Sequence, residues 1–340
     1  MKQNHHDVRP DSGASFSGRP KVLITRPIQQ EAIDLVSQHC EVRVHSVDEA
    51  MPAEMLMKAM RDVDGVMPSG VRLDANVINT ASKLRVIANI GVGYDNIDVD
   101  ACNRRRILVT NTPDVLTEAT ADLAFTLILA AARRVVEGDS YVRELRWTHW
   151  QWNFLWGSEM RGKTLGLYGF GRIGQATARR GRGFGMRMLY YARHRVPLSI
   201  EKELAAEFVD RETLLRESDF LSVHVPLTPE TRHGISGPEL ALMKPTALVI
   251  NTARGSIIEE EALVEALLAG RLAGAGLDVF EHEPQVHPSL ITMENVVLMP
   301  HVGSATAETR LRMALLAATN LLAAFNGRRP PNVINPEVLE

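Results

Sequence analysis

Residues 163–180 read KTLGLYGFGRIGQATARR, and the order of features in this stretch decides how the surrounding chain folds. Residues 164–168 alternate like a buried strand, glycines follow at 169, 171 and 174 in the spacing G-x-G-x-x-G, and a helix is predicted from Ile173 onward. A dinucleotide needs this order, because the glycines permit a tight turn and bare backbone, and helix N–H groups then face the pyrophosphate. Glycines also cluster in ordinary turns, but the strand before them and the helix after them favour a nucleotide site.

Length and composition restrict the classes of protein to consider. The 340 residues predict roughly two domains, since single cores stop growing below this size. Hydrophobic residues make up 45% and charged residues 23%, which is typical of a soluble globular protein. The net charge of −3 gives no general attraction to nucleic acid or membranes, and the most apolar run, Leu123–Ala132, is too short to span a bilayer. The two cysteines, Cys40 and Cys102, lack metal-ligand spacing and indicate a reducing compartment, so we expect a cytoplasmic protein without disulfides.

The first 18 residues differ in character from the rest of the chain. They are polar and contain no apolar stretch of the kind found in a signal peptide, so we interpret them as a flexible tail. His5 and His6 are expected to be a solvated pair, and no metal site is predicted.

Strand and helix patterns alternate along the chain and predict parallel sheets with helices on both faces. The first series ends near Thr110, well before the glycine turn, so we expect a separate α/β domain there with its break at Asn111–Pro113. An apolar helix over Leu116–Arg134 is predicted to cross between the domains. In chain order, strands are expected at 21–25, 41–45, 65–67, 85–88, 164–168, 186–191, 220–223, 247–251, 274–278 and 296–298, and helices at 28–38, 51–60, 74–80, 116–134, 259–269 and 306–325.

Six stretches from Asn89 onward carry a family resemblance: NIGVGYDNID (89–98), TPDVLTEATADLA (112–124), GFGRIGQATARR (169–180), INTARGSIIEEEAL (250–263), AGAGLDVFEHEP (273–284) and MPHVGSAT (299–306). They resemble the D-isomer-specific 2-hydroxyacid dehydrogenases, above all their glyoxylate/hydroxypyruvate reductase branch. The resemblance implies two doubly wound parallel-sheet domains with the active site in the cleft. A flavodoxin-like substrate domain would comprise residues 19–112 and 299–340, and a Rossmann nucleotide domain, residues 113–298, would be inserted into it.

Reduction of a 2-oxo acid requires a hydride donor, a proton donor for the oxygen and a cation for the carboxylate. The resemblance assigns the cation to Arg254, whose planar fork can hold a carboxylate in a bidentate manner. It assigns the proton donor to His301 and the carboxylate partner of that histidine to Glu283, although Glu281 in the same EHEP sequence competes for this part. Formate dehydrogenases of the same family have an amide partner instead, so a carboxylate argues against that chemistry.

The resemblance also implies where substrate and cofactor bind. Backbone N–H groups around Gly91, Val92 and Gly93 would hold the substrate carboxylate, with Ser69 and Gly70 opposite them. Asp278 would meet the nicotinamide carboxamide, and Thr120 would lie near the nicotinamide end. The remaining cofactor contacts would be made by Gly169, Gly171, Arg172, Ile173, Gly174, Val225, Pro226, Thr231, Thr252 and Gly303.

The end of the second strand after the glycine turn predicts the choice of cofactor. An NAD site places an acid about twenty residues past the glycines, where it holds the ribose 2′-OH. Here Tyr191 is followed by Ala192, Arg193, His194 and Arg195, and no Asp or Glu occurs between Gly174 and Glu201. Basic residues at the position where an NAD site has an acid can bind the negatively charged 2′-phosphate of NADP. The sequence therefore predicts NADP as cofactor, with NADPH preferred and NAD also usable.

These expectations combine into one leading function, NADPH-dependent reduction of glyoxylate or hydroxypyruvate to the D-2-hydroxy acid. Two alternatives stay open: a dinucleotide-sensing corepressor of the same fold, and an enzyme similar to phosphoglycerate dehydrogenase. All four tryptophans lie between residues 147 and 156. They indicate either local packing or a role at an interface or active site, and the family resemblance implies a homodimer.

Overall fold

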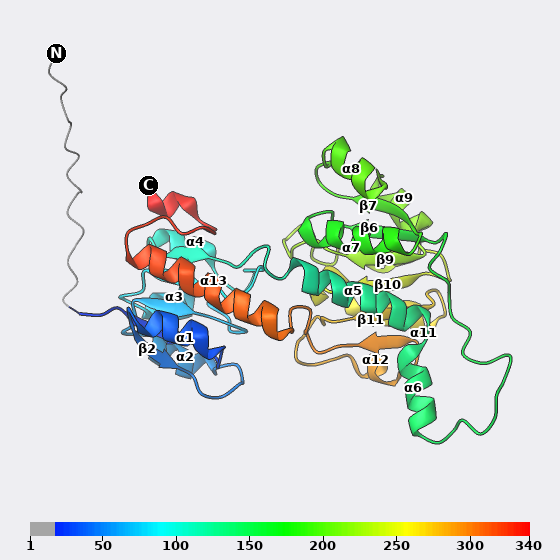
Figure 1. Ribbon diagram of the computed structural model, residues 1–340, viewed down its shortest axis with the longest axis horizontal. Helices are drawn as coiled ribbons and strands as arrows, with labels where there is room; N and C mark the ends of the chain where they lie inside the picture. The colour runs from blue at the N-terminus through cyan, green and yellow to red at the C-terminus, as the bar shows by residue number, and fades with distance from the viewer. Residues whose placement is uncertain (1–17) are drawn as a thin grey trace, which may run out of the picture. The chain divides into compact units, whose positions relative to one another are not determined.

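The computed structural model describes residues 18–340, which form two compact units. One unit consists of the described residues up to Pro113 together with Arg310–Glu340, and the other of Asp114–Thr309 (Figure 1). The predicted N-terminal tail, with His5 and His6, lies outside the described residues except for Gly18. The return to the first unit was expected at residue 299, but in the structure it falls between Thr309 and Arg310, so His301 and Gly303 lie in the second unit.

The first unit is built on a parallel sheet of five strands in the order β2-β1-β3-β4-β5. Strands β3, β4 and β5 are fully buried, whereas β2 at the edge alternates between exposed and half-buried residues. This order is that of a flavodoxin-like doubly wound sheet, in which helices cover both faces. The strands are β1 (Lys21–Ile24), β2 (Glu41–Val44), β3 (Gly65–Met67), β4 (Val86–Ala88) and β5 (Leu108–Thr110), and the helices are α1 (Gln30–Ser37), α2 (Ala53–Met60), α3 (Ala75–Thr80), α4 (Val99–Arg104), α13 (Ala307–Phe325) and the 3₁₀ turn η2 (Pro336–Leu339).

Helix α13 packs closely on this sheet although it comes from the far end of the chain. A Cβ atom added at Gly65 would come within 2.7 Å of the Phe325 ring and 2.9 Å of a Leu321 methyl group, so a larger residue at this position of β3 would displace these side chains of α13. The two helices α3 and α4 begin with Asp74 and Asp98, whose carboxylates accept the N–H of the third residue of each helix.

The second unit is a parallel sheet of seven strands in the order β12-β11-β10-β9-β6-β7-β8. The chain order reverses between β6 and β9, which is the switch point at which doubly wound sheets bind ligands. The prediction of two doubly wound parallel-sheet domains is therefore confirmed. The strands are β6 (Thr164–Tyr168), β7 (Arg187–Tyr191), β8 (Ala206–Phe208), β9 (Phe220–Val223), β10 (Leu248–Asn251), β11 (Gly274–Leu277) and β12 (Val296–Leu298), and the helices are α5 (Thr117–Ala132), α6 (Val135–Arg143), α7 (Arg172–Gly183), α8 (Leu198–Leu204), α9 (Arg211–Glu217), α10 (Gly237–Leu240), η1 (Gly255–Ile257), α11 (Glu260–Leu268) and α12 (Pro288–Thr292).

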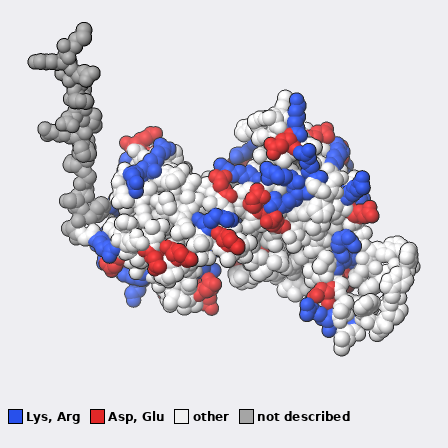
Figure 2. Space-filling model, viewed as in Figure 1, with Lys and Arg blue, Asp and Glu red and all other residues white. Residues whose placement is uncertain are grey.

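Helix α5 differs from its expected role as a helix crossing between domains. It packs against β10, β11 and α7, all within the second unit. Small residues bring it close to the sheet: Ala121 and Ala124 are fully buried, and a Cβ added at Gly276 would lie 2.9 Å from Cβ of Leu127. Over α7, which α5 contacts, Figure 2 shows basic side chains beside acidic ones, in agreement with the ion pairs of Arg180 with Glu118 and Asp122.

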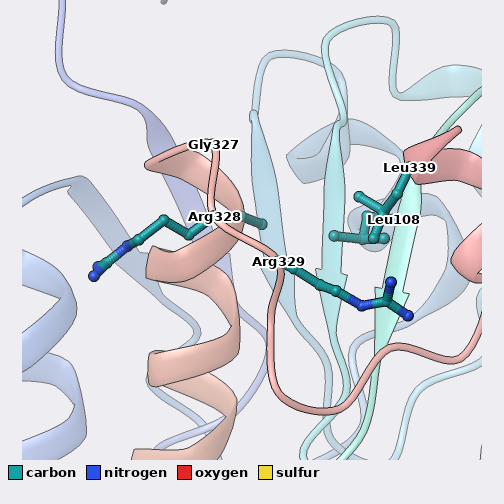
Figure 3. Close-up of a pocket in the computed structure, with 6 residues that line it drawn as sticks. Leu108, Gly327, Arg328, Arg329 and Leu339 are labelled. Atoms are coloured by element: carbon teal, nitrogen blue, oxygen red, sulfur yellow. The ribbon is translucent and has the colours of Figure 1, made fainter. Parts of the chain in front are cut away.

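A shallow cavity of about 300 Å³ in the first unit lies apart from every predicted site residue. Figure 3 shows that the side chains of Arg328 and Arg329 extend in opposite directions beside it. Its lining consists of Leu108, Ala324, Gly327, Arg328, Arg329 and Leu339. Separately, among residues 18–340 no helix is both long and apolar enough to cross a membrane.

Candidate active site

The glycine turn has the geometry that its sequence predicts. Gly169 follows β6 with φ of +100°, a conformation that disfavours any side chain, and a Cβ on Gly174 would lie 2.4 Å from the carbonyl oxygen of Gly169. Gly171 caps α7, and a Cβ added there would meet nothing within 4 Å. No side chain caps the helix and its first turn contains no acid, so its N–H groups are open to an anion.

The loop after β9 lies beside this turn. A Cβ on Gly169 would come within 2.8 Å of Val225 Cγ1. Thr231 fixes the loop, since its Oγ1 donates to the carbonyl of Pro226 at 2.7 Å and accepts the N–H of Thr228 at 2.8 Å. Beneath the turn, burial lowers the pKa of His224 to about 3, so this ring is neutral.

These features fit a nicotinamide dinucleotide. The bare Gly171 leaves room for a pyrophosphate, and Thr252, after β10, has a buried hydroxyl without a hydrogen-bond partner among the described residues. The Arg172 guanidinium pairs with Asp114 within the same unit, and Ile173 is half-buried on the first turn of α7. Among residues 18–340, no group of three or more His, Cys, Asp or Glu side chains could hold a metal ion.

Three adjacent parallel strands place the predicted catalytic residues at one edge of the second sheet. Arg254 follows β10, Glu283 follows β11 and His301 follows β12, and parallel strands put their carboxyl ends side by side. The His301 Nδ1 atom lies 2.7 Å from Oε2 of Glu283, and the other oxygen of Glu283 accepts the N–H of Phe280 at 3.0 Å. Because a carboxylate can only accept here, Nδ1 carries a proton and Nε2 is the atom that can face a substrate. The His301 side chain is 49% exposed.

The charge state of Glu283 follows from its surroundings. Burial alone would raise the pKa of this carboxyl, but the hydrogen bond and charge of His301, with the positive charge of Arg254, outweigh it and hold the pKa below its usual value. Glu283 is therefore ionised at neutral pH. The competing Glu281 is engaged elsewhere, since its Oε1 lies 2.5 Å from Nε2 of His233.

Asp278 supports the loop that bears His301. Its Oδ1 accepts the N–H of Val302 and its Oδ2 that of Gly303, both at 2.8 Å, and the side chain is fully buried. Burial raises the pKa of this carboxyl. Thr120 on α5 lies against the same loop, because a Cβ on Gly303 would sit 3.5 Å from its methyl group.

The basic residues after β7 divide into two kinds. Arg195 forms a bidentate ion pair with Glu201, both distances being 2.7 Å, and the hydroxyl of Tyr190 donates to the same carboxylate at 2.6 Å. These contacts lower the pKa of Glu201 to about 2. Arg193 and His194 are exposed, and within the described part of the chain neither forms a salt bridge. Sequence reasoning missed the Arg195–Glu201 pair, because Glu201 follows the segment of interest and returns to it only through α8.

In the first unit, the predicted substrate loop at Gly91–Gly93 follows β4, and the other predicted loop, with Ser69 and Gly70, follows the neighbouring β3. Sequence reasoning also missed a cation beside the second loop. A Cβ on Gly70, which has φ of +66°, would come within 2.9 Å of Nη2 of Arg26, the guanidinium that follows β1. Its position at a strand end of the same sheet, before Pro27, was the available signal.

Comparison with known proteins places this geometry in a family. Residues 125–303 match the family described as D-isomer specific 2-hydroxyacid dehydrogenase, NAD binding domain. A glyoxylate reductase of Thermococcus gammatolerans is 51% identical over 327 residues, which cover 95% of this chain and 98% of the relative. A glyoxylate reductase of Aeropyrum pernix is 50% identical over 329 residues, covering 95% and 98%.

Solved structures agree with the sequence relatives. A protein of Thermus thermophilus superposes with a TM-score of 0.86 at 46% identity, covering 92% of this chain and 99% of that one. An NADPH-dependent glyoxylate/hydroxypyruvate reductase of Sinorhizobium meliloti, in complex with NADP and malonate, gives a TM-score of 0.82 at 35% identity and covers 93% and 97%. The chain thus belongs to the D-isomer specific 2-hydroxyacid dehydrogenases, in their glyoxylate reductase branch, and is an NAD(P)-dependent dehydrogenase.

Proposed function

We propose that this enzyme reduces a small 2-oxo acid, glyoxylate or hydroxypyruvate, to the D-2-hydroxy acid. The observation that carries the proposal is the 2.7 Å pair of His301 with an ionised Glu283 at the strand edge that also bears Arg254. An acid, its orienting carboxylate and a carboxylate-binding cation are what this reduction requires. Two relatives with 51% and 50% sequence identity are named glyoxylate reductases, which supports this substrate class.

Arg254, His301 and Glu283 each have a separate role in the proposed reaction. Arg254 holds the substrate carboxylate and polarises the adjacent carbonyl, whose oxygen gains negative charge during reduction. When bound, the nicotinamide cofactor supplies the hydride to the carbonyl carbon. His301 then donates its Nε2 proton to the oxygen, and Glu283 holds the ring in the required orientation through Nδ1.

We further propose that NADPH is preferred over NADH, with Arg193 as the main contact of the 2′-phosphate. Arg193 is exposed just after the end of β7. The pKa of Glu230 on the neighbouring loop is lowered chiefly by the hydrogen bond of Thr228, and the charge of Arg193 adds to this in the same direction. Arg195 is held by Glu201, so its positive charge is already matched. His194 is a second exposed donor beside Arg193.

We also propose a homodimer formed through α6 and the aromatic segment, which we define as residues 144–157. Helix α6 buries none of its residues, and Figure 1 shows it projecting, with the segment that follows, from the rest of its unit. The four tryptophans of this segment are between 56% and 74% exposed, and this part of Figure 2 is largely uncharged. Exposed aromatic side chains at such density are typical of an interface, and a second copy supplies the same apolar surface.

The substrate proposal is tested by following NADPH oxidation with a panel of 2-oxo acids and determining product chirality. We expect glyoxylate and hydroxypyruvate to be reduced, the latter to the D-isomer, at rates well above those with larger 2-oxo acids. Absence of turnover with every 2-oxo acid, while NADPH still binds, would contradict the proposal and favour a dinucleotide-sensing role.

A further inference from the structure

In the loop Gly91–Gly93 of the first unit, all three carbonyl groups accept hydrogen bonds from other groups of the protein. The side-chain amide of Asn89 donates to the carbonyl of Gly93 at 2.8 Å and to that of Gly91 at 3.3 Å. The side-chain amide of Asn111 donates to the carbonyl of Val92 at 2.9 Å, and the N–H of Thr112 donates to Gly91 at 3.0 Å.

This arrangement decides where the N–H groups of the loop point. In a trans peptide the C=O of one residue and the N–H of the next point in opposite directions. Carbonyls of Gly91, Val92 and Gly93 that face inward therefore turn the N–H groups of the three following residues, 92 to 94, outward. No described residue accepts a hydrogen bond from these three groups, and the loop is partly exposed. Successive outward N–H groups form a concave site for an anion.

The two asparagines are themselves fixed. Asn89 and Asn111 are 4% and 8% exposed. The carbonyl of Asn111 accepts the side-chain amide of Asn320 on α13 at 3.0 Å, and the N–H of Asn111 donates to the carbonyl of Asn332 at 3.2 Å. A chain of side-chain amides thus runs from helix α13 to the loop.

We propose that Asn89 and Asn111 are positioning residues. They hold the carbonyl groups of this loop inward, so that its N–H groups point outward and bind the carboxylate of the substrate. The inference rests on the proposed reduction of a 2-oxo acid. An amide is needed because it donates: an aspartate of the same shape would present an acceptor to carbonyl oxygens, repel them and release the peptides from their orientation. The expected consequence is loss of carboxylate binding without loss of cofactor binding.

The test compares Asn89→Asp with a matched control, Asn335→Asp. Asn335 lies in the same unit, is 1% exposed, and its amide donates to the carbonyl of Ile107 at 2.9 Å, but it does not touch the loop. Both variants bury a carboxyl group where the wild type has a hydrogen-bonded amide. Their free energies of unfolding, measured in urea, should therefore fall to a similar degree. With NADPH saturating, Asn89→Asp should bind oxalate, a carboxylate probe, at least about tenfold more weakly, and the control should not.

A second readout separates positioning from general damage. The ratio of kcat/KM for glyoxylate to that for its methyl ester, which lacks the charge, should fall by about tenfold in Asn89→Asp and stay constant in the control. Asn111→Asp should behave like Asn89→Asp and replaces it if that variant does not fold. Equal oxalate affinity and equal ratios in Asn89→Asp and the control would overturn the inference. If the wild type reduces no 2-oxo acid, yet oxalate binding weakens only in the loop variants, the proposed function fails and the inference on the loop stands.

Discussion

Arg193 and Arg195 are two residues apart, but their surroundings differ, and we expect them to differ in function. Both are exposed, but Arg195 pairs with Glu201, whose carboxylate also accepts the hydroxyl of Tyr190, whereas Arg193 forms no salt bridge among the described residues. Arg193→Ala should therefore weaken NADPH binding by roughly ten- to hundredfold, the value of one charge-assisted contact, and leave NADH binding unchanged. Arg195→Ala should affect NADPH less. Titration of both cofactors by fluorescence measures this, and equal changes for NADPH and NADH in Arg193→Ala would show that the 2′-phosphate binds elsewhere.

Arg254 is expected to act in substrate binding and in the chemical step. Arg254→Lys keeps the charge but loses the fork, so KM for glyoxylate should rise and kcat should fall, each by about tenfold or more. The Kd of NADPH should stay within a factor of about two, because the proposal gives Arg254 no cofactor contact. Steady-state kinetics measures KM and kcat for glyoxylate, and a cofactor titration measures the Kd of NADPH. Near-normal kinetics would mean that another cation, such as Arg26, holds the carboxylate.

At the scale of the element, the glycine turn offers two substitutions with opposite expectations. A Cβ on Gly174 would lie 2.4 Å from the Gly169 oxygen, so Gly174→Ala must displace the turn and should cost about 1–3 kcal/mol of stability. A Cβ on Gly171 meets no protein atom within 4 Å, so Gly171→Ala should fold normally but weaken NADPH binding by filling the space of the pyrophosphate. Urea unfolding and cofactor titration measure the two effects. An unchanged Kd in a stable Gly171→Ala protein would contradict this placement of the pyrophosphate.

The elements also show what a sequence can and cannot predict. Buried parallel strands such as β6 and β9 were predictable, because short segments rich in apolar residues carry the signal. The short β8, with three residues, and α8 were not predicted, since so few residues show no period. Arg254, Glu283 and His301 were proposed from stretches that resemble the family, and each follows a strand of the second sheet. Some contacts form only when the chain has folded, such as Arg195 with Glu201 or Asn111 with Asn320, and these have no local sequence signal.

At the scale of the whole molecule, the aromatic segment tests the proposed dimer. Changing Trp150 and Trp152 together to Ala removes two exposed, contacting rings and should weaken the dimer by more than about tenfold. Leu268→Ala is the control, because this side chain is exposed to a similar degree but belongs to α11, outside the aromatic segment. Light scattering over a concentration series reads the mass. A dimer that persists in the double variant as in the control would leave only local packing as the role of these tryptophans.

The measurement that tests the central claim most directly is the rate of hydride transfer in a single turnover with glyoxylate and bound NADPH, followed across neutral and alkaline pH. In the wild type the rate should fall as pH rises, because the reduction consumes the proton that His301 donates. Glu283 is ionised throughout this range, because its pKa is lowered, so Glu283→Gln removes a negative charge and the fall should begin at lower pH. His301→Ala should react about 10²–10⁴-fold more slowly with the Kd of NADPH unchanged. A His301→Ala enzyme that transfers hydride at close to the wild-type rate, or a pH profile that Glu283→Gln leaves in place, would contradict the assignment of this pair as the proton donor.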